Sequence, residues 1–207
     1  MTVIAASGSR EDQIIAQVLQ SALNEQLEAD ESAPLKAEEI WREDAAGNLT
    51  HIQSGAQCPM RWGDYVRERV AVYMPDGTNV GCNYNSRDGR ILTFYVYESL
   101  DTLADELTGT FDAIKTRQPI SEEVRFGAGI PSSAYVARTL AYEQADGTKM
   151  RTSVLLADGG PWRLKVRLTC AAANAAQSEE AAGVALMGQA DRLESPRPPA
   201  TATPSPI

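Results

Sequence analysis

The chain has 207 residues, of which 43% are hydrophobic and 23% are charged, values typical of one ordinary globular domain. Its net charge of −9 comes without a stripe rich in lysine and arginine, which argues against binding to nucleic acid or to anionic lipid. No apolar run approaches the roughly 20 residues that cross a bilayer, so we expect no transmembrane segment.

The N-terminal region is predicted to be a helix followed by a connector. Residues 9–12 follow a capping-box pattern, and the apolar residues after them recur at helical spacing, which predicts an amphipathic helix over about 10–29. An acidic connector then ends at Pro34. We therefore expect an N-terminal helix and connector (1–33), a main α+β domain (34–192) anchored at its start by Ile40 and Trp41, and a tail (193–207).

The main domain begins with a block of predicted strands. Asp-Gly pairs separate apolar runs at four places, and Asp-Gly suits type I′ hairpin turns, in which both residues have positive φ. Hairpin turns favour an antiparallel meander over parallel βαβ units. The predicted strands cover residues 49–52, 66–74, 80–84, 91–97, 135–142, 150–156 and 162–170.

Two of these strands have informative patterns. In residues 162–170 apolar side chains alternate with Arg163, Lys165, Arg167 and Thr169, which predicts one buried face and one solvent-exposed face. Residues 91–97 are apolar at nearly every position, which predicts a central strand covered on both sides.

Two further helices complete the domain, over about 101–117 and 175–191, and each has an apolar stripe. The tail is rich in Pro, Ala and Thr and should be disordered, because it has almost nothing to bury. The fold class that follows is α+β, a curved antiparallel β-meander sheet flanked by helices. We expect the helices to lie together on one face of the sheet.

Few residues in the sequence point to chemistry. His51 is the single histidine, and its place at the start of a strand suggests a partly exposed structural residue. Glu122, Glu123, Glu179 and Glu180 fit solvated faces or the charges of a helix start. The glycines of residues 126–131 lack the strand-and-helix context of a phosphate-binding loop. We identify no catalytic, cofactor-binding or metal-binding residues and expect no cofactor, so an enzyme is not the favoured interpretation.

The three cysteines carry the sharpest hypothesis. The hairpin between Cys58 and Cys82 could bring them together as a disulfide requires, and Cys82 with Cys170 is the other possible pair. Cys170 has the buried parity of its strand and fits a small core residue. The alternative is three reduced thiols in a cytosolic protein. A disulfide would indicate an oxidising compartment.

Two resemblances add to this interpretation. Ser54-Gly55-x-x-Cys58-Pro59 followed by Gly81-Cys82-x-Tyr84 resembles a pattern in uncharacterised bacterial envelope proteins. The order of elements from about 49 to 191 is similar to that of the Mog1/PsbP-like fold, whose members mostly act as binding or assembly factors. The second resemblance implies a non-enzymatic role.

The sequence therefore supports three functional hypotheses. The first is a non-catalytic interaction or assembly module of the bacterial periplasm or cell envelope, with a protein partner and with Tyr95, Tyr97 and Trp62 as anchors. The second is a hydrolase or small-molecule-binding protein, with a pocket between the sheet and the loop 126–133 and with carboxylates or His51 as acid–base groups. The third is an acidic secretion-chaperone-like protein, for which a cytoplasmic location is the alternative.

Overall fold

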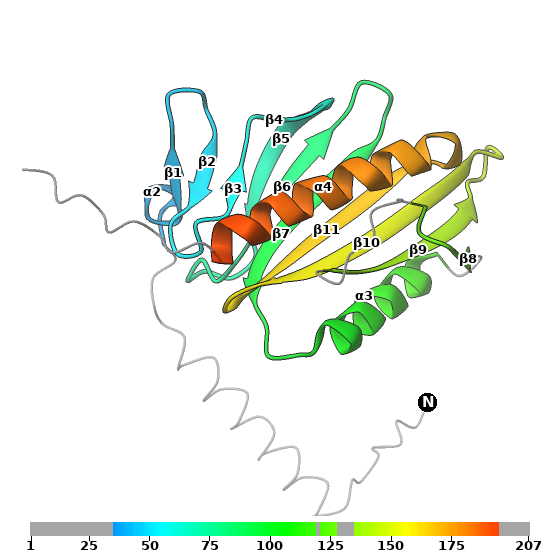
Figure 1. Cartoon of the computed structure of the whole chain (residues 1–207). Helices are drawn as coiled ribbons and strands as arrows, with labels where there is room; N and C mark the ends of the chain where they lie inside the picture. The colour runs from blue at the N-terminus through cyan, green and yellow to red at the C-terminus, as the bar shows by residue number, and fades with distance from the viewer. Residues whose placement is uncertain (1–34, 119–120, 128–134, 195–207) are drawn as a thin grey trace, which may run out of the picture. The chain divides into compact units, whose positions relative to one another are not determined.

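The structure, a computed structural model, describes residues 35–118, 121–127 and 135–194 (Figure 1). The helix expected over 10–29, its connector and the tail from residue 195 onward lie outside the described residues.

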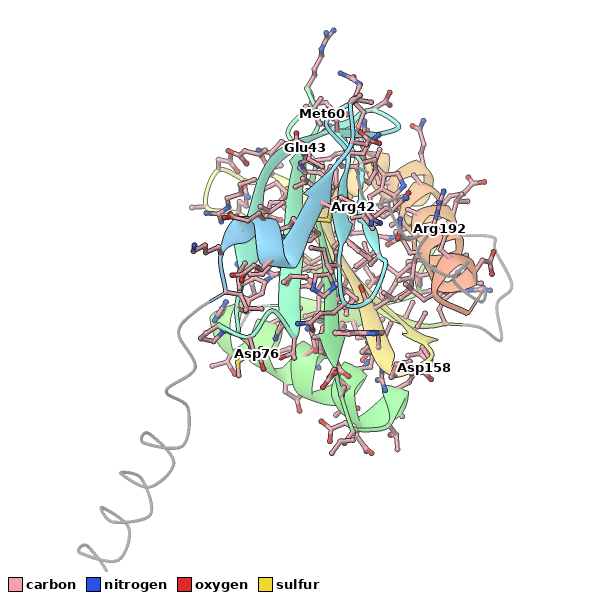
Figure 2. All side chains as sticks on the ribbon, turned by 90° about the vertical axis from the view of Figure 1, so that its left-hand side faces the viewer. Arg42, Glu43, Met60, Asp76, Asp158 and Arg192 are labelled. Atoms are coloured by element: carbon pink, nitrogen blue, oxygen red, sulfur yellow. A yellow bond between two sulfur atoms is a disulfide. The ribbon has the colours of Figure 1, made fainter. Side chains whose placement is uncertain are left out.

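A small antiparallel sheet forms the start of the described chain. Helix α2 (Ala37–Ile40) leads directly into β1 (Trp41–Glu43), which pairs with β2 (Leu49–His51), and β2 pairs in turn with β3 (Gln57–Cys58). Ile40 and Trp41 are both buried, as expected for the residues that anchor this end of the domain. Figure 2 looks onto this sheet, and the side chains of Arg42 and Glu43 on β1 are exposed to solvent.

The second sheet is larger, open and antiparallel throughout, with eight strands in the order β4-β5-β6-β7-β11-β10-β9-β8. It consists of two meanders, because β4 to β7 are consecutive and β8 to β11 return from the far end to place β11 beside β7. The chain passes from the first meander to the second through helix α3 (Leu103–Arg117). The strands are β4 (Arg61–Trp62), β5 (Tyr65–Val72), β6 (Asn79–Asn85), β7 (Ile91–Glu98), β8 (Ser121–Val124), β9 (Val136–Glu143), β10 (Lys149–Gly159) and β11 (Trp162–Ala171). The fold class expected from the sequence, α+β with a large antiparallel sheet, is therefore confirmed.

The turns between these strands differ from the expected type. Gly77, Gly89 and Gly147 have φ between 79° and 83°, whereas no residue other than glycine has positive φ in the described ranges. A type I′ turn needs positive φ at both central residues, so these are not type I′ turns. The amide of Gly147 donates to the carbonyl of Gln144, which makes the glycine the last residue of a four-residue turn. Asp keeps an ordinary negative φ because the glycine alone adopts the left-handed conformation.

The two long helices lie on opposite faces of the large sheet, which corrects the expectation of a single face. Leu155 and Ala157 of β10 belong to the core cluster under α4 (Ala175–Glu194), whereas Val154 and Leu156 of β10 pack with the apolar side of α3. Figure 1 shows α4 crossing in front of the sheet and α3 lying beside β9 and β10. The physical reason is that β10 is apolar at successive positions, so both of its faces need cover.

The sequence predicted that β7 is covered on both sides, but in the structure β10 is the strand that helices cover on both sides. β7 is central in the sheet, and its Leu92, Phe94 and Val96 are buried on the α4 side. On its other side Ile91 is 48% exposed whereas Thr93 is buried, and α3, which packs mainly on β9 and β10, reaches β7 beside Tyr95. We call this side of β5, β6, β7 and β11 the open face.

The buried side predicted for the last strand is confirmed, whereas its other side is not fully exposed to solvent, because Arg163 is buried and Lys165, Arg167 and Thr169 are half-buried. Trp162, Leu164, Val166, Leu168 and Cys170 of β11 are all buried in the core beneath α4. Their neighbours in the sequence point to the open face. In the part of the chain that the structure describes, no helix is long and apolar enough to cross a membrane.

Candidate functional site

His51 is a core residue, not the partly exposed strand residue that the sequence suggested. Its side chain is fully buried between the rings of Trp41 and Trp162, each with its centroid 5.4 Å from that of the imidazole. Nε2 lies 2.9 Å from the carbonyl oxygen of Gly77, and Nδ1 lies 2.8 Å from Oγ of Ser54. A carbonyl only accepts, so Nε2 donates and Nδ1 is left to accept. His51 therefore ties the small sheet to the turn at Gly77 and presents no group to a surface.

Cys58 of β3 and Cys82 of β6 form a disulfide, the pair that the sequence favoured. Their Cα atoms are 6.2 Å apart, and both residues are buried. Cys170 is a free, buried thiol in the core under α4, and burial raises its pKa. The disulfide therefore links the small sheet to the large one, at a place where Gln57 N also donates to Oε1 of Gln189 on α4 at 2.8 Å.

Three tyrosines form a platform on the open face. The rings of Tyr73 and Tyr95 lie 5.7 Å apart between centroids and are tilted by 32°, and Tyr97 is two residues farther along β7. The two rings lie over Gly81 of β6, where a Cβ atom would be 3.1 Å from a carbon of Tyr73 and 3.3 Å from one of Tyr95. The absence of a side chain at Gly81 therefore makes room for the rings. Tyr73 is 47% exposed, so part of this tyrosine platform is accessible to a partner.

Lys165 of β11 lies against the same platform. It is paired with Tyr95 in the sheet, and its Nζ lies 4.9 Å from the ring centroid of Tyr95 and 4.8 Å from that of Tyr97. Burial among these rings is the main reason that the pKa of Lys165 is lowered, and the nearby charge of Arg167 lowers it further, whereas Glu106 raises it. The hydroxyl of Tyr97 is buried and has no hydrogen-bond partner among the described residues.

A cavity of about 150 Å³ opens beside Lys165, between α3 and the strands β7 and β11. We call it the cationic cavity, because three of its lining residues are Arg117, Lys165 and Arg167. Its other lining residues are Tyr95, Thr110, Ala113 and Ile114. In the described ranges none of the three cations forms an ion pair.

Glu106, the acid whose charge raises the pKa of Lys165, forms its ion pair with another cation. Glu106 of α3 accepts a 2.9 Å bond from Arg163, a buried residue of β11 that also forms an ion pair with Asp158. Arg163 is thus neutralised by two carboxylates, although the sequence pattern assigned it to a solvent-exposed face. Arg163 is therefore a cation with a structural role, whereas Lys165 and Arg167 on the same strand form no ion pair within the described residues.

Trp62, the third anchor suggested by the sequence, lies on the opposite face. Its ring packs edge-on against Tyr84 and Phe94, with centroids 5.6 Å away in each case. It lines a hollow of about 330 Å³ between β4, β5 and α4. The structure therefore brings Tyr95 and Tyr97 together but separates Trp62 from them.

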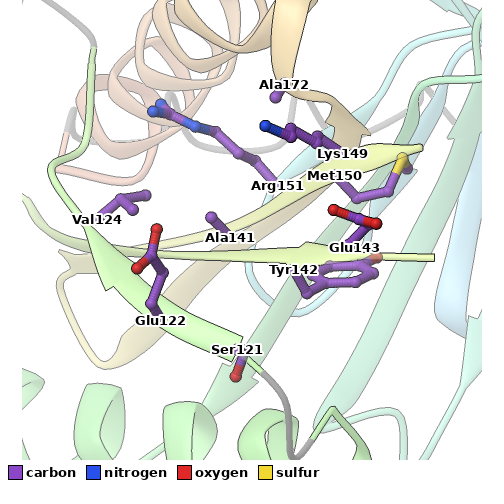
Figure 3. A pocket seen from close by; sticks show the side chains of 10 residues that line it. All are labelled: Ser121, Glu122, Val124, Ala141, Tyr142, Glu143, Lys149, Met150, Arg151 and Ala172. Carbon is purple, nitrogen blue, oxygen red and sulfur yellow. The ribbon is translucent and has the colours of Figure 1, made fainter. Parts of the chain in front are cut away.

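A second depression lies over β8, β9 and β10 (Figure 3). Its volume is about 760 Å³, and its charged lining residues are Glu122, Glu143, Lys149 and Arg151. Figure 3 shows Arg151 and Lys149 rising from β10 on the same side as Ala172. Residues 128–133 of the predicted pocket lie outside the described residues. We call this depression the mixed-charge groove.

Glu179 borders this region and was misassigned from the sequence as a solvated or helix-start charge. It is fully buried, and its carboxylate accepts bonds from the amide of Gly127, from Ser153 at 2.7 Å and from Thr139 at 3.2 Å. Arg151 lies 3.9 Å away as an ion-pair partner. Glu179 thus connects α4 to β9, β10 and the segment that ends at Gly127. A signal existed in the sequence, because the buried Ala175, Ala182 and Leu186 are four, three and seven residues away and place Glu179 on the same stripe.

The described residues contain no group of three or more His, Cys, Asp or Glu side chains arranged to hold a metal ion. Comparison with models of protein families and with curated proteins finds no match to this chain. The functional argument therefore rests on the geometry of the open face and of the mixed-charge groove.

Proposed function

We propose that this protein is a non-catalytic interaction or assembly module, and that a protein partner binds to its open face. The observation that carries the proposal is the tyrosine platform together with the cations beside it, which form no ion pair with any residue that the structure describes. Tyr and Arg are enriched at the energetic centres of protein interfaces, and Tyr buries a large, rigid area at a low cost in conformational entropy. Packed rings over Gly81 are also pre-organised, which lowers the ordering cost of binding.

We further propose an oxidising compartment, such as the bacterial cell envelope, as the place where the protein works. The support is the disulfide between Cys58 and Cys82, which is buried and joins two sheets. Disulfides of this structural kind persist where thiols are not kept reduced.

A second candidate function is the binding of a small molecule in the mixed-charge groove. Its volume of about 760 Å³ is in the range of ligand sites, and carboxylates and cations line it together. A thermal-shift screen against a metabolite library tests this. A compound that stabilises the wild type but not the Lys149→Met variant supports the groove, and a screen without such a compound counts against it.

The main proposal is tested by site-specific photocrosslinking. p-Benzoylphenylalanine replaces Tyr73 on the open face, or Val184, which is 61% exposed on α4, as the matched control on the opposite face. Each protein is irradiated in the envelope fraction of the source cells. We expect one discrete adduct at position 73 and none at position 184. Adducts of equal yield at both positions, or none at position 73, would contradict a binding surface on the open face.

A further inference from the structure

We propose that the cationic cavity binds a side-chain carboxylate from a short acidic segment of the partner protein, with Arg117, Lys165 and Arg167 as its ligands. This inference rests on the proposed function, since the cavity opens next to the tyrosine platform on the same face. It adds the chemistry of the partner, which is a carboxylate placed beside an apolar or aromatic residue that lies on the platform.

The first argument is the imbalance of charge within the cavity. Lys165 and Arg167 are neighbours on the same side of β11, and Arg117 approaches from the last turn of α3. Their like charges repel one another, and Lys165 is partly removed from water by the rings of Tyr95 and Tyr97. The repulsion among the three cations destabilises the free protein. An anion placed between them would be attracted to all three and would offset this repulsion.

The second argument is that this cluster runs against the charge of the whole chain. The net charge is −9, yet Glu106, the acid whose charge acts on Lys165, forms its ion pair with Arg163. On the far side of the platform Arg69 of β5 is also exposed, and in the described ranges it forms no ion pair. The open face is therefore locally cationic on an acidic protein, which is complementary to an acidic segment.

The size of the cavity decides what kind of anion fits. A volume of about 150 Å³ accommodates one or two small groups, and its wall includes the apolar Ala113 and Ile114. Nucleic acid would need a longer track of cations to neutralise successive phosphates. A carboxylate at the end of a flexible side chain reaches such a cavity while its backbone lies along the exposed Tyr73. The geometry thus favours an acidic peptide.

The test is a titration of the full-length, ¹⁵N-labelled protein with a capped decamer of glutamate, followed by NMR. We expect saturable shifts of the amides in residues 93–97, 110–117 and 163–167. The variants Lys165→Met and Arg167→Met keep an unbranched apolar stem but lose the charge, and each should weaken binding about tenfold. Arg42→Met removes an exposed cation on β1 and is the matched control, which should change the affinity less than twofold.

Several outcomes would overturn the inference. One is an equal loss of affinity in Arg42→Met, which would show general electrostatic attraction. Another is inorganic phosphate that saturates the same amides while the decamer does not, which would make the cavity a site for a small free anion. A third is an unchanged yield of the adduct at position 73 in Lys165→Met and Arg167→Met. In that last case the partner still binds the open face, so the proposed function stands and the acidic segment alone is wrong. If the decamer binds as expected but position 73 gives no adduct, the proposed function fails while the anion site stands.

Discussion

Removal of the disulfide gives the most quantitative prediction for this protein. Cys58 and Cys82 are 24 residues apart, and the Cys58→Ala/Cys82→Ala double variant opens the loop that they close. In the chain-entropy model, removing a cross-link that closes a loop of that length lowers the free energy of unfolding by about 3.5 kcal/mol at 25 °C. For a domain of this size, that loss corresponds to a decrease of about 10 °C in Tm.

Urea denaturation with and without reductant measures this loss. The oxidised wild type should unfold at a higher urea concentration than the double variant, and reductant should lower the midpoint of the wild type but leave that of the double variant unchanged. Cys170→Ala is the control, because it removes a buried thiol without opening a loop. Its effect should be that of a small core substitution and should not depend on reductant.

Two results would refute the reasoning. Intact mass measurement that finds three free thiols in the oxidised protein would remove the cross-link itself. A wild-type midpoint that is the same with and without reductant, once reduction is verified by mass, would show that the link between the two sheets does not restrict the unfolded chain.

Three further predictions concern single side chains. Burial lowers the pKa of Lys165 in the folded state, so the unfolded state binds more protons between the lowered pKa and the ordinary one, and wild-type stability gains as pH rises through that interval. Lys165→Met should therefore be more stable than the wild type at neutral pH, and this difference in stability should shrink toward pH 10. Urea denaturation at a series of pH values measures the difference, and a difference that is constant with pH would contradict the prediction. Glu179→Ala should lose about 3 kcal/mol, because it strips three donors of their buried acceptor, whereas the exposed Glu180→Ala should change stability by less than about 0.5 kcal/mol. His51→Ala should lose about 3 kcal/mol through a cavity and an unpaired carbonyl, with the adduct at position 73 retained at a temperature where the variant is folded, and loss of that adduct would implicate His51 in binding.

The errors at His51 and Glu179 have one cause. A charged or polar residue in a sequence is expected to face water, because most such residues do. At both positions a buried partner set compensates for burial: Ser54 and the carbonyl of Gly77 for the histidine, and Ser153 with the amide of Gly127 for the carboxylate. Apart from Ser54, which is three residues from His51, these partners come from segments at least 26 residues away in the chain, so the sequence did not identify them, although the apolar stripe of the last helix indicated that Glu179 is buried.

The candidate site on the open face was also only partly predictable from the sequence. The alternation of β11 alone assigns Lys165 and Arg167 to the side opposite the core, and Tyr95 and Tyr97 were suggested as anchors on general grounds. What the sequence did not show is that β7 and β11 are neighbours, which puts Lys165 opposite Tyr95, or that the end of α3 brings Arg117 to the same cavity.

The sequence by itself determined the α+β class, the positions of the main strands and helices and the buried side of β11, and it favoured one cysteine pair while leaving Cys82 with Cys170 and three free thiols open. The class, the elements and the buried side follow from side-chain periodicity and turn residues, which act between residues close in the chain, and the cysteine pair was favoured because a hairpin was expected between the two residues. Only the tertiary structure decided which face each helix covers, which face stays open and which charges are paired. Those features depend on the pairing of β7 with β11, strands from two separate meanders, because it sets which side chains become neighbours across the sheet and leaves α3 packed mainly on β9 and β10.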